Sequence, residues 1–250
     1  MTHRDSPRRI KDTIDKGCRH RSEPARVFFR ADDIGIPSRQ FQLLIDCFIK
    51  HRIPLCLATV PAWITTRRFE ELKQVTGSNS TQWCWHQHGR LHHNFEQRGK
   101  KQEFGPSRTK EEIKESLIKG KQRLEEILGD EFQPIFTPPW NRCSSETIES
   151  LTELGFNALS RSRGAKPETV PELPDFQVGV DLHTRKGLSP TLGFKNLLSE
   201  LEETISSGQC GIMIHHQRMN TRAFELLDLL LDTINRTPQL TPVLFSTLLQ

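Results

Sequence analysis

The segment ARVFFRADDIG, residues 25–35, is an apolar run that ends in two adjacent carboxylates and a glycine. Its valine and phenylalanines predict a strand over 25–31, directly followed by Asp32 and Asp33. Adjacent residues leaving a strand point in different directions, so one carboxylate can bind a metal while the other reaches a water. A pair of aspartates after a strand is also common in ordinary turns, so the motif needs support from elsewhere in the chain.

Short apolar runs recur along the rest of the chain, with helical patterns between many of them. Further strands are predicted at 54–60, 81–87, 134–137, 157–161, 176–182, 211–215 and 243–248. Helices are predicted at 38–52, 107–129, 145–154, 193–206 and 221–235. This alternation predicts an α/β fold with a barrel-like sheet of seven to eight strands.

The unusual polar residues fall at the carboxyl ends of predicted strands. In a barrel of alternating strands and helices these ends converge on one face, where catalytic sites are built. The polar stretches are 32–33, 86–88, 137–142, 181–183 and 215–216. We therefore expect them to line a common mouth.

The stretch WHQHGRLHHN, residues 85–94, supplies imidazoles next to the third predicted strand. Three residues separate His88 from His92, so the two imidazoles are close enough to share a zinc ion or a similar divalent cation. His86 and His93 leave other pairings open, and histidine-rich stretches also occur as surface loops or satisfied core groups. The stretch is not the helical HExxH of metalloproteases, because Gly89 occupies the position of the catalytic glutamate. Two histidines with one aspartate would leave coordination positions open for water and substrate.

The order of four motifs resembles that of the polysaccharide deacetylase family, also called the NodB-homology or carbohydrate esterase family 4 group. RADDIG at 30–35 and HGRLH at 88–92 resemble the family's TFDDG and HSxxH. TPPW at 137–140 and IMIH at 212–215 resemble its Arg-Pro-Pro-Tyr turn and its Leu-x-Ile-His motif. The resemblance covers most of the chain, from Phe28 to Phe245, and implies a distorted (β/α) barrel of the NodB-homology type.

The resemblance also implies a role for each matched residue. Asp32 would be the general base and His215 the general acid, whereas Asp33, His88 and His92 would bind the metal. The implied cofactor is a divalent metal. Zinc is the first expectation, and cobalt, nickel and manganese are the other candidates. The residues expected to contact substrate are Pro139, Trp140, Asn141, Arg142, His93, His183 and His216.

Two features depart from the family pattern. Thr137 stands where the family has an arginine that orients the base, and Arg142 and Arg30 are the candidates to replace it. The aspartate that holds the catalytic histidine has no clear counterpart, and Asp181 is the nearest suggestion. Among the tryptophans, Trp63 and Trp140 are expected to offer flat faces to a sugar ring, whereas Trp83 and Trp85 are expected to pack in the core.

Composition favours one ordinary globular domain. The 250 residues carry a formal charge of +4, and basic residues cluster in residues 1–24, which we expect to form a flexible arm before a single domain at 25–250. That arm lacks the aromatic residues that stack on bases, so a nucleic-acid partner is not expected. No segment has the length and hydrophobicity of a signal peptide or a membrane span, which predicts a cytoplasmic protein without a membrane partner. The six cysteines form no CxxC pair and are expected to be reduced and buried.

These observations predict a hydrolase that removes an N-acyl group, acetyl or formyl, from an amino sugar or a soluble sugar conjugate. The expected partner is a small-molecule or oligosaccharide substrate, and the oligomeric state stays open. Two alternatives are an amidase for a non-sugar carbon–nitrogen bond and a catalytically inactive carbohydrate-binding homologue. The altered turn at Thr137 motivates both.

Overall fold

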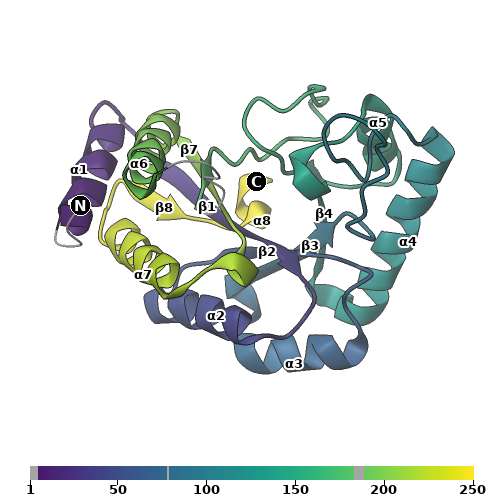
Figure 1. The fold of residues 1–250 in the computed structure, drawn as a ribbon, viewed down its shortest axis with the longest axis horizontal. Coiled ribbons are helices and arrows are strands. Elements are labelled where there is room, and N and C mark those ends of the chain that lie inside the picture. Colours follow the sequence, from purple (N-terminus) through teal and green to yellow (C-terminus); the bar gives the residue numbers. More distant parts are fainter. Residues whose placement is uncertain (1–4, 78, 183–188) are drawn as a thin grey trace. The chain divides into compact units, whose positions relative to one another are not determined.

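The structure is a computed structural model that describes residues 5–77, 79–182 and 189–250. Strands and helices alternate along the chain, which confirms the predicted α/β class (Figure 1). The strands are β1 Ala25–Ile34, β2 Leu55–Thr59, β3 Trp83–His88, β4 Phe132–Thr137, β5 Ala158–Leu159, β6 Val180–Asp181, β7 Gln209–Ile214 and β8 Leu240–Pro242. The helices are α1 Ser6–Cys18, α2 Arg39–His51, α3 Thr66–Thr76, α4 Lys110–Leu128, α5 Ser145–Glu153, α6 Pro190–Ser206, α7 Thr221–Asn235 and α8 Phe245–Leu248.

The sheet has the strand order β5-β4-β3-β2-β1-β7-β6, and β8 pairs with β1. The pairs β3–β4, β4–β5, β1–β7, β6–β7 and β1–β8 are parallel. Parallel pairing of neighbouring strands brings their carboxyl ends to the same edge. The polar residues at the ends of β3 and β4, His88 and Thr137, therefore lie side by side.

Contacts divide the chain into two compact units, each assembled from segments that are distant in the sequence. The first unit comprises Met1–Ala31, Ser38–Leu55 and Val178–Leu248. The second comprises Asp32–Pro37, Cys56–Gln177 and Leu249–Gln250. Neither unit begins at the boundary predicted between residues 24 and 25.

In the first unit, helix α1 occupies much of the segment that the sequence predicts to be a flexible arm. Ile10 and Ile14 are fully buried, and α1 packs against α6. At Gly17 an added Cβ would lie 2.9 Å from the Cβ of Ile205 on α6, so the two helices approach closely there. The apolar residues recur at helical spacing between the basic side chains, and this narrow stripe is enough to dock the helix. The high charge of the segment hides the stripe.

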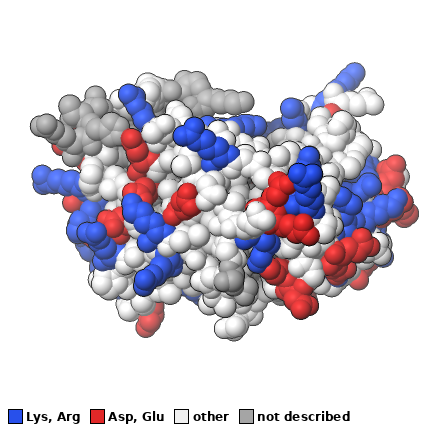
Figure 2. Space-filling model, turned by 90° about the horizontal axis from the view of Figure 1, so that it is seen from below, with Lys and Arg blue, Asp and Glu red and all other residues white. Residues whose placement is uncertain are grey.

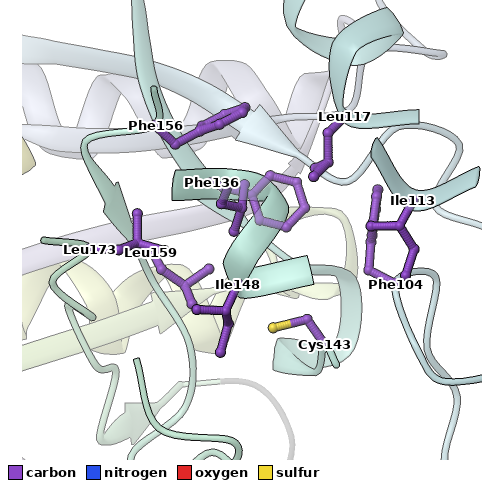
Figure 3. Close-up of a cluster of buried hydrophobic side chains, with 10 residues drawn as sticks. Phe104, Ile113, Leu117, Phe136, Cys143, Ile148, Phe156, Leu159 and Leu173 are labelled. Atoms are coloured by element: carbon purple, nitrogen blue, oxygen red, sulfur yellow. The ribbon is translucent and has the colours of Figure 1, made fainter. Parts of the chain in front are cut away.

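In the second unit, buried side chains from α4, β4, α5 and the loops around them form a hydrophobic cluster (Figure 3). Phe136 of β4 lies 5.1 Å from Phe104 and 5.9 Å from Phe156, measured between ring centroids. Ile113 and Leu117 of α4 are fully buried in the same cluster. The cluster supports the strand whose end carries Thr137.

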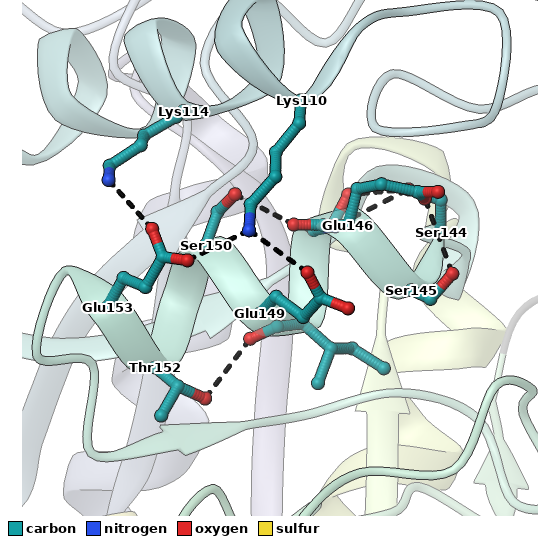
Figure 4. A network of polar contacts seen from close by, with 11 residues as sticks. Lys110, Lys114, Ser144, Ser145, Glu146, Glu149, Ser150, Thr152 and Glu153 are labelled. Atoms are coloured by element: carbon teal, nitrogen blue, oxygen red, sulfur yellow. Dashed lines mark hydrogen bonds and ion pairs between the residues drawn. The ribbon is translucent and has the colours of Figure 1, made fainter.

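Charged side chains link the exposed sides of α4 and α5 (Figure 4). The Lys110 ammonium donates to Glu149 at 3.0 Å and to Glu153 at 2.8 Å, and the Lys114 ammonium donates to Glu153 at 2.7 Å. Glu153 accepts both lysines, which lowers the pKa of its carboxyl to about 2. Exposed ion pairs contribute little to stability individually, so the buried cluster is the main support of this unit.

Most predicted strands exist, with shifted ends, but the last one is wrong. The sequence predicts a strand at 243–248; instead β8 is Leu240–Pro242 and residues 245–248 form helix α8. Phe245 is fully buried and its ring lies 5.1 Å from that of Phe28. A short buried apolar run has no periodicity that separates a strand from a helical turn. The predicted strands 157–161 and 176–182 shrink to the two-residue strands β5 and β6.

The composition also leads to expectations about surface charge, membrane-spanning helices and the state of the cysteines. On the face drawn in Figure 2, basic and acidic side chains are interspersed. Among the described helices, none combines the length and hydrophobicity required to cross a bilayer. All six cysteines are free thiols, and all except the half-buried Cys47 are buried.

Candidate metal centre and active site

Three of the side chains singled out by the sequence meet in the second unit. The Oδ1 atom of Asp33 lies 3.1 Å from Nε2 of His92 and 3.4 Å from Nε2 of His88. One ligand atom from each residue lies within 4.8 Å of the other two. Ligands about 2.0 to 2.1 Å from a tetrahedral metal are about 3.3 to 3.4 Å apart, so the two distances from Asp33 are close to those around a zinc-sized divalent cation.

His88 is held in the tautomer that a metal ligand needs. It is the last residue of β3, and its Nδ1 atom lies 2.9 Å from the backbone carbonyl oxygen of Thr137 on β4. A carbonyl oxygen only accepts, so Nδ1 carries the hydrogen, and in the neutral ring the lone pair of Nε2 faces Asp33. The β3–β4 register shifts between His86 and Gln87, and such an irregularity re-aims the side chains that follow it.

The electrostatics of this cluster call for a positive charge between its members. Burial raises the pKa of the Asp33 carboxyl, but hydrogen bonds and charge from His88 and His92 outweigh it and hold the pKa well below its usual range. Burial lowers the pKa of His88, but the carboxylates of Asp33 and Asp32 raise it above its ordinary value. A carboxylate oxygen and two imidazole nitrogens all accept hydrogen bonds or bind cations, so a proton or a metal stabilises their close approach. A divalent cation satisfies all three ligands together.

The loop between the two histidines is organised by Glu103, a residue that the sequence analysis does not single out. Its fully buried carboxylate accepts the backbone N–H groups of Arg90 at 3.1 Å, Leu91 at 2.7 Å and His92 at 2.9 Å. Burial raises the pKa of this carboxyl, and the three backbone donors work in the opposite direction. No spacing rule links Glu103 to the histidines, because their contacts depend on how the long segment between β3 and α4 folds back on itself.

Gly89 is required at its place in the same loop. Its φ of +57° is in the left-handed region, and a Cβ there would lie 2.6 Å from Cγ of Pro139 and would also overlap the carboxylate of Glu103. Any side chain would therefore push the Pro139 turn away from the histidine loop. The glycine explains how this loop differs from the helical HExxH arrangement.

Left-handed backbone conformations concentrate at this site. Among the described residues, the non-glycine positions with positive φ are Asp33, Arg52, His92, Trp140 and Asn141. All of them except Arg52 belong to the predicted metal ligands or to the turn expected to contact substrate. Such conformations are unfavourable for residues with a Cβ and persist where the surrounding structure enforces them, which is common at functional sites.

Two tryptophans flank the second histidine. The rings of Trp140 and Trp63 lie 4.8 Å and 5.3 Å from the ring of His92, and both side chains are half-buried. Arg123 of α4 donates to the carbonyls of Pro61 and Ile64, both at 2.7 Å, and so anchors the loop that carries Trp63. The predicted core tryptophans are buried, with Trp83 4% and Trp85 0% exposed, which confirms their packing role.

The other residues of the histidine stretch have different surroundings. His86 is fully buried, with Nδ1 3.3 Å from the carbonyl oxygen of Cys84 and Nε2 3.0 Å from the hydroxyl of Thr137. His93 is exposed, and its ring contacts that of Phe95 at 4.9 Å. Of the alternative pairings left open by the sequence, the one that meets Asp33 is His88 with His92.

The buried Thr137 occupies the position of the family's arginine, and its hydroxyl contacts His86. The guanidinium of Arg142 donates to the carbonyl of Lys101 at 3.3 Å. Arg30 is fully buried in the first unit and donates to Sδ of Met213 at 3.1 Å. Their predicted role in orienting Asp32 stays a prediction.

The remaining predicted site residues lie in both units. In the second unit, Asp32 is buried near the end of β1, and Pro139 and Asn141 belong to the short turn Pro139–Asn141. In the first unit, His215 follows β7, and His216 is 1% exposed with its ring 5.9 Å from that of Phe41. Asp181 pairs in register with Met213. His183 lies outside the described residues.

The comparisons with known proteins find likeness in structure alone. No protein-family model matches the chain, and no curated protein matches it. A protein from Mycobacterium smegmatis assigned to the polysaccharide deacetylases superposes with a TM-score of 0.66 at 13% identity, covering 92% of this chain and 90% of that one. A family 4 acetyl xylan esterase from Clostridium thermocellum, in complex with a cobalt ion, superposes with a TM-score of 0.58 at 11% identity and covers 89% of both chains.

A third similar structure belongs to a family 4 pseudoenzyme from Bacillus anthracis, in the form of a mutant with restored enzymatic activity. It superposes with a TM-score of 0.60 at 13% identity and covers 92% of this chain and 69% of that one. The fold thus occurs in proteins with and without activity, and the residues of the site must carry the functional argument. The chain has the fold of the polysaccharide deacetylases of carbohydrate esterase family 4, the distorted (β/α) barrel that its motifs predict.

Proposed function

We propose that the protein is a metal-dependent hydrolase that removes an acetyl or formyl group from the nitrogen of an amino sugar or a soluble sugar conjugate. The observation that carries the proposal is the approach of Asp33 Oδ1 to the Nε2 atoms of His88 and His92 within 3.1 to 3.4 Å. The fold, shared with structures of family 4 esterases and deacetylases, supports it. The four left-handed residues at the same place are a second and independent support.

Asp33, His88 and His92 would hold the metal, and their mixed nitrogen and oxygen donor set suits zinc or cobalt. A divalent metal bound there would polarise the acyl carbonyl and make a water molecule more acidic. The backbone carbonyl of Thr137, which accepts from His88, fixes the orientation of that ring. These contacts explain why the ligands would be preorganised.

Asp32 would accept a proton from the attacking water. It lies near the end of β1 directly beside Asp33, and its negative charge already acts on His88. His215 would deliver a proton to the departing nitrogen, because an amine cannot leave as an anion. The two roles would separate base and acid between different segments of the chain.

The turn at Trp140 would stabilise the negative charge that develops on the carbonyl oxygen. The backbone N–H groups of Asn141 and Arg142 donate to the carbonyls of Pro138 at 2.9 Å and Pro139 at 3.5 Å. Pro139 has no N–H, so in this described turn the amide of Trp140 is the donor that would serve the oxyanion. The ring of Trp140, beside His92, would carry the sugar.

The test is hydrolysis of a panel of N-acetyl and N-formyl amino sugars by the purified protein loaded with zinc or cobalt. We expect release of acetate or formate, and we expect Asp32→Asn to lower kcat/KM by about a hundredfold or more while it retains bound metal. Asp46→Asn, a matched change at an exposed position on α2, should have no effect. Acid release that is unaffected by Asp32→Asn would refute the assigned chemistry.

A carbohydrate-binding homologue without turnover is the second candidate, because the hydroxyl of Thr137 contacts His86 at the position where the family has an arginine. The similar fold of a family 4 pseudoenzyme supports this second candidate. Metal analysis separates the two candidates at an early stage. Sugar binding by a protein that takes up no metal and releases no acid would favour the binding role.

A further inference from the structure

A groove with basic walls adjoins the candidate metal centre within the second unit. It has a volume of about 400 Å³ and is lined by Trp140 and by segments around Lys100 and Ser162. Its charged lining residues are Lys100, Arg142, Arg163 and Lys166. Among the described residues that line it, none is an aspartate or a glutamate. We call this feature the cationic groove.

Two of the basic side chains of the cationic groove, Lys166 and Arg142, make contacts that leave their positive charge available to a ligand. Lys166 forms an ion pair with Glu168, but these side chains are 71% and 81% exposed, so solvent screens the pair. Arg142 donates to a backbone carbonyl, which leaves its formal charge in place. Lys101 adds a further ammonium group 6.0 Å from the ring centroid of Trp140. An anion would therefore find several cationic donors in one place.

Trp140 connects the cationic groove to the metal ligands. The indole is a wall of the groove, and its ring lies 4.8 Å from that of His92. Asn141 and Arg142, also in the wall, continue the turn expected to contact substrate. A molecule whose acylated nitrogen sits at Asp33, His88 and His92 would extend over the indole into the groove, whose volume suits a group of the size of one sugar.

We propose that the cationic groove binds an anionic group, a phosphate or a carboxylate, on the substrate whose acylated nitrogen lies at the metal ligands. The inference rests on the proposed function and narrows it from amino sugars in general to acidic ones. Arginine guanidinium groups present paired donors that match the oxygens of carboxylate and phosphate, and lysines add positive charge. Gln102 and Ser162 supply neutral polar groups in the same walls.

The first experiment measures binding by calorimetry with the zinc-loaded protein, without any need for turnover. The probes are N-acetylglucosamine, its phosphorylated form, N-acetylmuramic acid, which carries a carboxylate, and inorganic phosphate. We expect at least one of the two acidic sugars to bind about tenfold more tightly than the neutral sugar, with a preference that declines as salt is added. Equal affinities for all three sugars would overturn the proposal.

The second experiment locates the preference. Lys100→Gln/Arg163→Gln should reduce the ratio of acidic to neutral affinity by about fivefold or more. The matched control is Arg67→Gln/Arg236→Gln, which removes the same charge from side chains that are 88% and 77% exposed and lie outside the groove. A ratio that falls equally in both variants would show a general charge effect and overturn the assignment to the groove. Thermal unfolding verifies that each variant is folded.

Turnover assays on the same sugars keep the two hypotheses apart. Acid release without a preference for acidic sugars would leave the hydrolase proposal standing and contradict the cationic groove. A binding preference that depends on Lys100 and Arg163, with no acid released from any sugar, would support the groove and contradict the hydrolase.

Discussion

The carboxylate of Glu103 receives three consecutive backbone N–H groups from the loop that joins His88 to His92. One of these donors belongs to His92 itself, so the carboxylate positions a predicted ligand through its backbone and not through its ring. A residue one step removed from a metal ligand commonly alters metal affinity when it is changed. Glu103 is therefore a positioning residue by this geometry.

Replacing Glu103 tests this role. In Glu103→Gln an amide NH₂ group must face a backbone N–H, so at least one hydrogen bond is lost and two donors are brought together. We expect zinc affinity to fall by about ten- to hundredfold, measured by calorimetry and by the fluorescence of the tryptophans beside His92. Glu96→Gln is the control, because Glu96 holds Ser107 and not the histidine loop. Unchanged zinc affinity in Glu103→Gln would contradict the positioning role.

Metal binding should also depend on pH through His88. Its pKa is raised, since the charges of Asp33 and Asp32 outweigh the opposing effect of burial. A proton on Nε2 must leave before a metal binds there, so the apparent metal affinity should increase with pH, by up to about tenfold per pH unit below that pKa. Calorimetric titrations from about pH 6 to about pH 8 measure this slope. An affinity that is constant over the range would exclude proton competition at His88.

At the scale of elements, helices with wide apolar faces and clear caps can be predicted well. Helix α4 begins at Lys110, and Thr109 and Glu112 form a capping box, while Ile113 and Leu117 are buried. Helix α3 escapes prediction because its buried residues are few, Leu72 and Thr76 among polar neighbours. Charge similarly hides α1. Where packing depends on one or two side chains, periodicity in the sequence is too weak to reveal the helix.

Helix α1 should contribute measurably to stability. Ile14 is fully buried on the helix that packs against α6, and truncation of a buried isoleucine removes apolar burial and leaves a cavity. We expect Ile14→Ala to lower the free energy of unfolding by about 2 to 5 kcal/mol in denaturant titrations. Lys16→Ala, at an exposed position of the same helix, should change it by less than about 0.5 kcal/mol. A flexible arm would instead make both changes equally small.

Over the whole molecule, the sequence predicts more of the candidate site than of the sheet's details. Motif order identifies Asp33, His88 and His92, and the structure brings their side chains together. The contacts of Glu103 depend on how the segment between β3 and α4 folds back on itself. The cationic groove depends on contacts between loops that are distant in the chain, and spacing reveals neither feature. The short strands β5 and β6 are similarly defined by pairing with neighbours and not by their own composition.

The thiols provide a test of packing across the molecule. Burial raises the pKa of Cys143 to about 11 and that of Cys210 to about 12, so at pH values near 8 almost no reactive thiolate forms. We expect the native protein to react slowly with a thiol reagent, beginning at the half-buried Cys47, and all six thiols to react in concentrated guanidinium. Cys47→Ser should remove the first reacting thiol. Rapid reaction of several thiols in the native state would contradict the packing.

The left-handed backbone conformations of Asp33, His92, Trp140 and Asn141 reduce the stability of the fold. At about 1 kcal/mol each, these four conformations lower the free energy of unfolding by about 4 kcal/mol, and its usual total is only about 5 to 15 kcal/mol. If these left-handed conformations had no function, mutation would be expected to replace the residues by glycine or to relax their backbone to negative φ. The presence of all four at one site therefore indicates that their geometry is kept for function, at a cost in folding stability.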